Sequence, residues 1–222
     1  MIDQLIIGTK SSYGDFEASV KERIDHFPKK KSIKESVPFS NKVYDFSKIN
    51  GEVYWEERQL EYIFEITAAS AEELEDKKRE FAAWVMNVDN EKIYDPFIQD
   101  FHFEGTFADI DFDDSEFEKS TVTVMFTAYP YMIANIAKVI NLSLIEGSEI
   151  SIVVNNGSSH RINPTFISDV PFLLKMGSSS YGISAGETTD KRFWFASGEN
   201  SIRLQSTEGN GTLRIEFYEE VF

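Results

Sequence analysis

Apolar and polar residues alternate most regularly along Lys119–Ala128. One face of this stretch carries Val122, Val124 and Phe126, and the other carries Thr121, Thr123, Met125 and Thr127. A period of two predicts a half-buried β-strand. Pro130 has no amide hydrogen to donate and favours an extended conformation at Tyr129. We therefore expect the strand to end near Ala128 and a second domain to begin directly after it.

Similar patterns predict further strands before this point. They cover Ile2–Ile7, Val43–Phe46, Glu52–Arg58, Leu60–Thr67 and Phe101–Phe112. The Leu60–Thr67 pattern is the most regular of these, with one apolar face at Leu60, Tyr62, Phe64 and Ile66. Asn50–Gly51 predicts a hairpin turn, and Gly8, Ser11, Ser12 and Gly14 predict a turn after the first strand. Phe16–Phe27 fits a helix or a strand, with extended structure favoured.

One helix is predicted, over about residues 70–88. Ser70 is a candidate N-cap and Glu73 follows three residues later, which is the spacing of a capping box. Leu74, Phe81, Trp84, Val85 and Val88 then form a single apolar stripe at helical spacing. Such a stripe is typical of a helix that packs on a sheet.

After residue 130 the chain changes to short strands separated by Gly, Ser and Asn turns. The expected strands are Lys138–Ile145, Glu149–Asn155, Arg161–Ile167, Phe172–Met176, Arg192–Ala196, Ser201–Ser206 and Thr212–Glu219. Seven short strands without a helix predict an antiparallel β-sandwich. We therefore expect two domains, an N-terminal β domain with one helix at 1–130 and a sandwich at 131–222.

Composition supports a folded, β-rich chain. Of 222 residues, 41% are hydrophobic and 14% aromatic, which is enough for a sizeable core and favours pleated structure. A net charge of −16 repels phosphate backbones and argues against a specific nucleic-acid partner. The absence of cysteine suits synthesis in a reducing cytoplasm, and no apolar run is long enough to predict a membrane span.

No motif predicts catalysis, a cofactor or a metal site. His26, His102 and His160 are far apart, and no pair has the spacing of a zinc site. The acidic run from Asp109 to Glu118 lacks the glycine and glutamate of a calcium loop, so we interpret it as a solvated turn between two strands. The lysine cluster at residues 29–34 is interpreted as a solvated loop in preference to a localisation signal or phosphate patch.

Three residues of the second domain suggest a sugar contact. His160, Asn163 and Trp194 are similar to the histidine, asparagine and tryptophan with which galectins hold hydroxyl groups and stack on a pyranose ring. The gap between His160 and Asn163 is one residue longer than in galectins, and no arginine follows Pro164. The simpler interpretation of residues 193–195 is a core strand with one outward face.

The order of several weak motifs resembles a known family over nearly the full length of the chain. The N-terminal half contains Pro28–Pro38, Tyr44–Ser47, Glu56–Arg58, the capped helix and Tyr129–Tyr131; the C-terminal half contains Asn155–Gly157, Asn163–Phe166, Ser197–Ile202, Gly211–Ile215 and Tyr218–Glu220. In this order they resemble the distal tail protein family of long-tailed, non-contractile phages.

The resemblance implies a fold and a role. It implies an N-terminal split-barrel-like β domain with one helix, which closes into a hexameric ring, and a galectin-like C-terminal sandwich. Such a ring is a hub at the tail tip of the virion that joins the tail tube protein to the tail-tip protein and the receptor-binding protein. It implies no enzymatic activity and no membrane insertion.

Two other functions remain open from the sequence. One is a carbohydrate-binding adhesion module that acts through the C-terminal sandwich. The other is a hydrolase with a pair of carboxylates, because an acidic chain brings some carboxylates together in any fold. A stable hexamer would favour the hub, and a monomer with saturable glycan binding would favour the adhesin.

Overall fold

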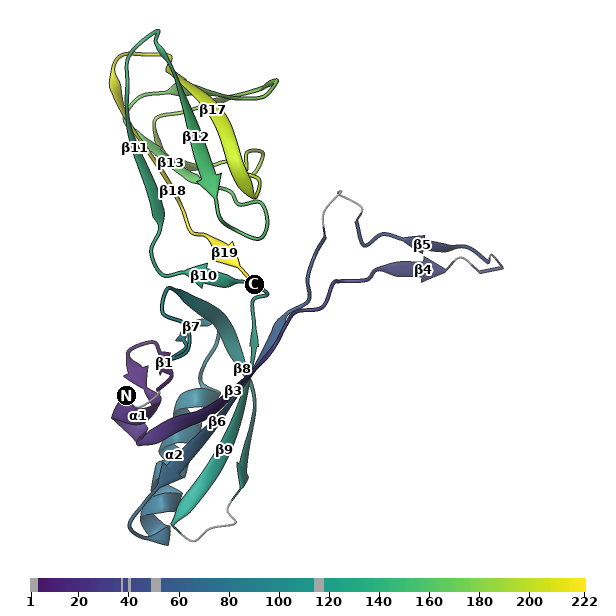
Figure 1. The fold of residues 1–222 in the computed structure, drawn as a ribbon, viewed down its shortest axis with the longest axis vertical. Coiled ribbons are helices and arrows are strands. Elements are labelled where there is room, and N and C mark those ends of the chain that lie inside the picture. Colours follow the sequence, from purple (N-terminus) through teal and green to yellow (C-terminus); the bar gives the residue numbers. More distant parts are fainter. Residues whose placement is uncertain (1–3, 37, 40, 49–52, 114–117) are drawn as a thin grey trace. The chain divides into compact units, whose positions relative to one another are not determined.

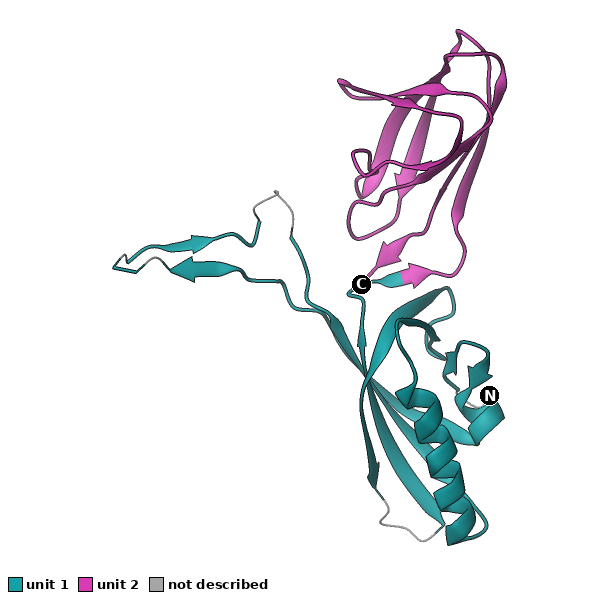
Figure 2. Ribbon diagram, turned by 180° about the vertical axis from the view of Figure 1, so that it is seen from behind, with its two compact units in different colours: residues 1–132 teal, residues 133–222 magenta. Residues whose placement is uncertain are grey.

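The structure is a computed structural model that describes residues 4–36, 38–39, 41–48, 53–113 and 118–222. The chain divides into two compact units, Met1–Met132 and Ile133–Phe222, each with its own buried core (Figures 1 and 2). Both units consist mainly of antiparallel β-strands, which confirms the predicted mainly β fold class. The predicted turn at Asn50–Gly51 lies outside the described residues.

The first unit is organised around one antiparallel sheet. The strands follow the order β2 (Lys10–Ser11), β1 (Ile6–Ile7), β7 (Glu91–Tyr94), β8 (Phe101–Asp113), β9 (Lys119–Ala128), β6 (Arg58–Thr67) and β3 (Ala18–His26). The sequence of Phe16–Phe27 fits a helix or a strand. Strand β3 occupies most of this segment, so the preference for extended structure is confirmed. The long central strands β6 and β9 pair along their whole lengths, from Arg58 opposite Ala128 to Thr67 opposite Lys119.

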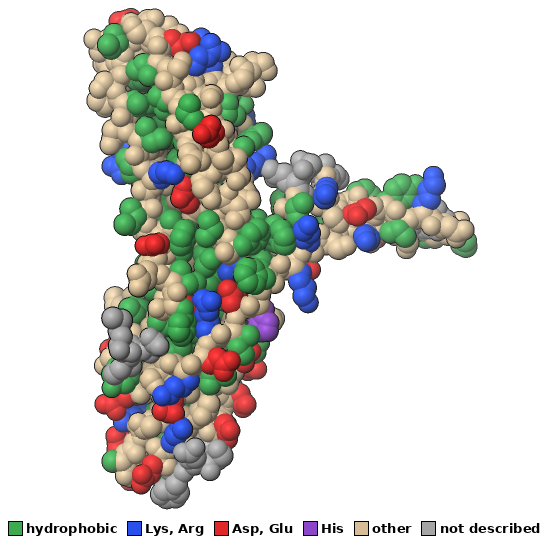
Figure 3. All heavy atoms as spheres, viewed as in Figure 1, with side chains coloured by type: hydrophobic (Ala, Val, Ile, Leu, Met, Phe, Trp, Pro, Cys, Tyr) green, Lys and Arg blue, Asp and Glu red, His purple; other side chains and the backbone are tan. Residues whose placement is uncertain are grey.

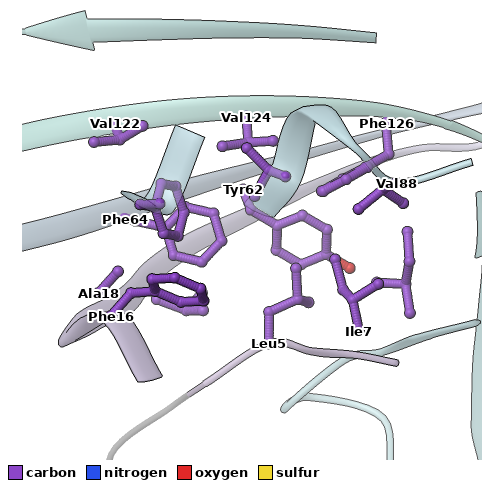
Figure 4. Close-up of a cluster of buried hydrophobic side chains, with 14 of the residues drawn as sticks. Leu5, Ile7, Phe16, Ala18, Tyr62, Phe64, Val88, Val122, Val124 and Phe126 are labelled. Carbon is purple, nitrogen blue, oxygen red and sulfur yellow. The ribbon is translucent and has the colours of Figure 1, made fainter. Parts of the chain in front are cut away.

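The inner face of this sheet carries the residues that the alternation predicts. Side chains on β6 and β9 that point to this face are buried and pack together (Figure 4): Leu60, Tyr62, Phe64, Ile66, Val122, Val124 and Phe126. The Phe64 ring meets the Phe81 ring of the helix edge to face at 5.0 Å. Complete burial of so many large side chains makes this face the main source of stability in the first unit.

The predicted helix is α2 (Ala71–Met86), and it begins as the capping box requires. The amide of Glu73 donates to the Ser70 hydroxyl at 3.2 Å, and the Glu73 carboxylate accepts from the amide of Ala69 at 3.0 Å. Leu74, Phe81 and Val85 are buried in the core of the unit. The helix ends two residues earlier than predicted.

A second, short helix, α1 (Ser12–Phe16), stands where the sequence predicts only a turn. Its first turn is held by two reciprocal contacts: the Ser11 hydroxyl accepts from Gly14, and the Asp15 carboxylate accepts from the amide of Ser11 at 2.7 Å. The helix turns Phe16 inward, where its ring stacks on Trp84 at 4.8 Å. This local capping outweighs the turn preference of Gly14, whereas Gly8 lies in a turn after β1 as predicted.

A β-bulge in β8 changes which residues face the core. The register against β9 shifts between Phe107 and Asp109. Phe107 packs against the core before the shift, and Ile110 and Phe112 pack against it afterwards. Because one extra residue reverses the alternation, the exposed carboxylates that follow the bulge point to the outer face of the sheet: Asp109, Asp111 and Asp113.

The segment between β3 and β6 leaves the sheet and forms a separate two-stranded ribbon. Its strands are β4 (Lys34–Ser36) and β5 (Val43–Asp45), paired with Lys34 opposite Asp45 (Figure 1). Backbone bonds continue the pairing toward the sheet, including Lys31 N to Tyr54 O and Glu56 N to Lys29 O at 2.8 Å each. We call residues 29–56, as far as the structure describes them, the arm.

The second unit consists of two four-stranded antiparallel sheets packed around a core. One sheet has the order β11 (Lys138–Leu144), β18 (Gly211–Phe217), β13 (Thr165–Ser168) and β16 (Gly186–Thr189). The other has the order β12 (Glu149–Asn156), β17 (Gly198–Ser206), β14 (Phe172–Met176) and β15 (Ser179–Ile183). Two short strands, β10 (Met132–Ala134) and β19 (Glu220–Val221), also pair with each other.

Two strands predicted in the second unit differ from the structure. Arg192–Ala196 is not a strand, although Phe193 and Phe195 are buried as its alternation requires. It begins in a turn, where Phe193 N donates to Asp190 O, and it pairs only through a single bridge between Phe195 and Ile162. The predicted strand from Arg161 is correspondingly shorter and begins at Thr165, because Pro164 has no amide hydrogen for a ladder.

Candidate assembly interface

The predicted sugar-contact residues come together beside the bridge between Ile162 and Phe195. The Asn163 side-chain amide donates to Phe193 O at 2.6 Å, so it ties down the backbone of the neighbouring segment. His160 Nε2 lies 3.1 Å from a carboxylate oxygen of Glu220. The sugar-contact role of these residues stays a prediction.

Trp194 is partly covered within its own unit. The Arg161 guanidinium lies over the indole at 4.3 Å from the ring centroid. A cation at that distance occupies the ring face that a pyranose would use. Sugar stacking there would require the Arg161 side chain to move.

Ionic residues gather at the root of the arm, where β3 ends and β6 begins. Arg58 is fully buried, with its guanidinium 3.5 Å from Asp25. Asp95, also buried, accepts from the Tyr62 hydroxyl at 2.7 Å and from Arg23 at 3.1 Å. These contacts join β3, β6 and the turn after β7 at the point where the ribbon leaves the sheet.

The protonation of this group fits a structural role. Burial lowers the pKa of Arg58, an effect that Asp25 opposes. Burial, reinforced by Asp95, holds the pKa of Tyr62 well above its ordinary value, so the phenol remains a hydrogen-bond donor. Asp25 and Asp95 each face a cation, whereas Asp25 Oδ1 and two nitrogens of Arg58 are buried without a hydrogen-bond partner.

No metal or membrane feature appears in the part of the chain that the structure describes. No three histidine or acidic side chains there are arranged to hold a metal ion. Equally, the helices among these residues are too short or too polar to span a bilayer.

The arm exposes apolar side chains on both faces. Every residue of β4 and β5 is exposed, and Figure 3 shows apolar and basic side chains along the ribbon. Its large exposed apolar residues are Ile33, Phe39, Val43, Tyr44 and Phe46, with Phe39 fully exposed and Val43 exposed at 61%. An isolated two-stranded ribbon buries too little surface to be stable alone in water. The arm therefore has the character of a surface that binds a partner.

A second candidate surface is the unpaired edge of β8. Strand β7 pairs with β8 only over Phe103–Gly105. In the order of the seven strands given above, β9 is the only neighbour that pairs with β8 beyond Gly105, and that pairing continues to Asp113. Strand β10 also pairs with β8, and the Tyr129 amide, which precedes β10, donates to Glu104 O at 2.8 Å, before the bulge. The segment of β8 after the bulge therefore has an edge that is open to a further strand.

Comparison with solved structures gives a full-length match. A crystal structure described as SPP1 Dit (gp 19.1), "a Paradigm of Hub Adsorption Apparatus in Gram-positive Infecting Phages", superimposes with a TM-score of 0.70. The match covers 100% of both chains at 12% sequence identity. The chain has the fold of SPP1 Dit. This confirms, for the fold, the resemblance to distal tail proteins that the order of motifs predicts.

Other comparisons add little. A chain of the phage P2 baseplate in its activated conformation with Ca matches over 97% of this chain and 98% of its own length, at 9% identity and a TM-score of 0.42. No family model and no curated protein matches the sequence.

The interface residues are harder to predict from sequence than the fold. The acidic run is visible in the sequence, but its place on an unpaired strand edge depends on the pairing of β7 and β9 with β8. The sequence pattern predicts a solvated loop for the lysine cluster at residues 29–34, whereas Lys34 belongs to β4. The signal that could have identified the arm is the mixture of lysines with Ile33, Val43 and Tyr44, since a solvated loop has no need for large apolar residues.

Proposed function

We propose that this protein is a structural component of a phage or prophage tail tip. Six copies form a ring that serves as a hub between the tail tube protein and the tail-tip and receptor-binding proteins. It is made in the host cytoplasm, acts in the virion tail tip and has no catalytic role. The observation that carries the proposal is the full-length match to the SPP1 Dit fold.

The exposed arm supports assembly in particular. A ribbon with all six strand residues exposed contributes nothing to the core of its own unit. Heterologous contacts between identical subunits close into a ring when the rotation between neighbours allows it. An exposed ribbon and an open strand edge on one chain supply two different surfaces, as such a contact needs.

The experiment is to measure the mass of the purified full chain by sedimentation velocity and light scattering, and to image it by electron microscopy. We expect a species of six subunits and ring-shaped particles. A monomer at every concentration would contradict the hub. A monomer with saturable glycan binding that Trp194→Ala abolishes would instead favour the adhesin.

A further inference from the structure

We propose that the arm of one copy adds as a strand to the open edge of β8 in a second copy. This inference rests on the proposed ring and names the surfaces that join its subunits. Strand addition to an exposed sheet edge is a recurrent mode of recognition, in which backbone hydrogen bonds give affinity. Both surfaces belong to the first unit.

Charge is the observation that selects a second copy as the partner. Between residues 29 and 56 the chain has six lysines and four carboxylates, a net charge of +2. The whole chain has −16, so the remainder carries −18. A basic arm on an acidic chain is attracted to other copies of that chain, and complementary potentials both steer and orient association.

The open edge of β8 fits the arm more closely than the opposite edge of the sheet. Asp109, Asp111 and Asp113 are all exposed along it, in alternate positions. Strand β3 forms the other long edge, and its two cations, Lys21 and Arg23, are balanced by Glu22 and Asp25 on the same strand. A basic ribbon is attracted to the row of aspartates, whereas the balanced charges of β3 offer it no comparable attraction.

The backbone amides along the open edge of β8 also allow an added strand to pair. The Ile110 amide donates to its neighbour's carboxylate, Asp109 Oδ1, at 2.9 Å. That contact satisfies an edge amide in the isolated chain and can be exchanged for a carbonyl of an added strand. The Phe107 amide is already used by Val88 O at 2.9 Å, so the open segment begins after the bulge.

On the arm, β4 is the strand that fits this edge. Lys34 belongs to β4, and Lys30 and Lys31 precede it along the same strand of the ribbon. Strand β4 pairs with β5 on one side only, which leaves its other edge free to pair. The segment after the bulge, Asp109–Asp113, is long enough to take all of β4.

The first test exchanges charges between the two surfaces. Lys31→Glu with Lys34→Glu on the arm, or Asp109→Lys with Asp111→Lys on β8, should each weaken self-association about tenfold or more. The four substitutions combined should restore most of it, because the attraction is re-formed with opposite signs. Glu187→Lys with Glu208→Lys is the matched control for the β8 pair, since it raises the net charge by the same amount in the second unit and should not reproduce the loss.

The second test is cross-linking, which the absence of cysteine makes direct. Chains with Ser32→Cys or Ser36→Cys on the arm are mixed with chains carrying Asp111→Cys and treated with a short bis-maleimide. We expect a covalent dimer of the two different chains. Glu208→Cys replaces Asp111→Cys in the control and should give none.

The outcomes separate this inference from the proposed function. Rings of six without the arm-to-β8 cross-link, or without rescue by the charge exchange, overturn the inference and leave the hub standing. A chain that stays monomeric and forms no cross-link at high concentration overturns both. A cross-link that forms only inside the double variant Ser36→Cys/Asp111→Cys shows that the arm folds back on its own chain, which also overturns it.

Discussion

Strands β6 and β4 belong to ladders of the same kind, separated by a short stretch of chain, yet they differ completely in burial. Along β6 every second side chain is buried, and its ladder with β9 lies over the core. Along β4 and β5 every side chain is exposed. Antiparallel pairing alone therefore does not decide stability. Stability depends on what the faces of a ladder contact. Both faces of the arm are free to contact another molecule.

The largest expected effect on stability concerns the packed ladder of β6 and β9. Phe64→Ala removes a fully buried ring that contacts Phe81, and should lower the free energy of unfolding by about 3–5 kcal/mol. The matched change in the arm, Phe39→Ala, should alter it by no more than about 0.5 kcal/mol, because that ring is fully exposed. Urea unfolding of the isolated chain measures both. Equal losses would contradict the comparison.

Stability should be nearly as sensitive to substitution at the root of the arm, where β3 ends and β6 begins. Arg58→Met leaves the Asp25 carboxylate, exposed at only 12%, without its cation, and should cost about 3 kcal/mol. Adding Asp25→Asn should recover part of that loss, since no charge then remains unpaired. Urea unfolding would again report the values. If the single variant is as stable as the parent, the buried pair does not hold the root of the arm.

Buried polar contacts should also contribute to the stability of the second unit at the places where its ladders are interrupted. The Asn156 side-chain amide donates to three carbonyls, His160 O, Phe195 O and Ala196 O, at 3.1–3.2 Å. Asn156→Ala should therefore lower stability by about 1–3 kcal/mol. Hydrogen exchange should show the loosening in the second unit alone. Exchange that increases in the first unit would show that the two units are coupled.

The smallest expected effect concerns the outer surface of the packed ladder. Hydrogen bonds from Lys119 and then Lys21, each at 2.9 Å, lower the pKa of Glu65. Its contribution to stability is present above the unfolded value of about 4.5 and is lost as the pH falls through the lower folded value. Glu65→Gln should cost at most about 1 kcal/mol at neutral pH and nothing in strong acid. A cost that persists in acid would contradict the ion-pair explanation.

The sequence predicts the packed ladder far better than the arm. Alternation along Leu60–Thr67 and Lys119–Ala128 predicts both strands and their buried faces, because one face of each is apolar. The capping box predicts the start of α2. Strand β4 gives no such signal, since Lys34, Glu35 and Ser36 are all polar and nothing packs on them.

What the sequence does not predict is set by contacts between distant segments. The helix α1 depends on reciprocal bonds between Ser11 and Asp15 and on the packing of Phe16 against Trp84. The open edge of β8 depends on β7 ending its ladder early. Phe193 and Phe195 are buried as an alternating strand would require, yet their segment pairs through one bridge only.

The bulge between Phe107 and Asp109 has an evolutionary consequence. Deleting one residue there would exchange the two faces of the rest of β8, turning its aspartates inward and Ile110 and Phe112 to water. The gain or loss of one residue at this position is therefore a single genetic event that changes which charged side chains lie on the outer face of the strand. Moving the bulge would thus change the charge that the strand presents outward and, at the same time, which of its side chains pack on the core.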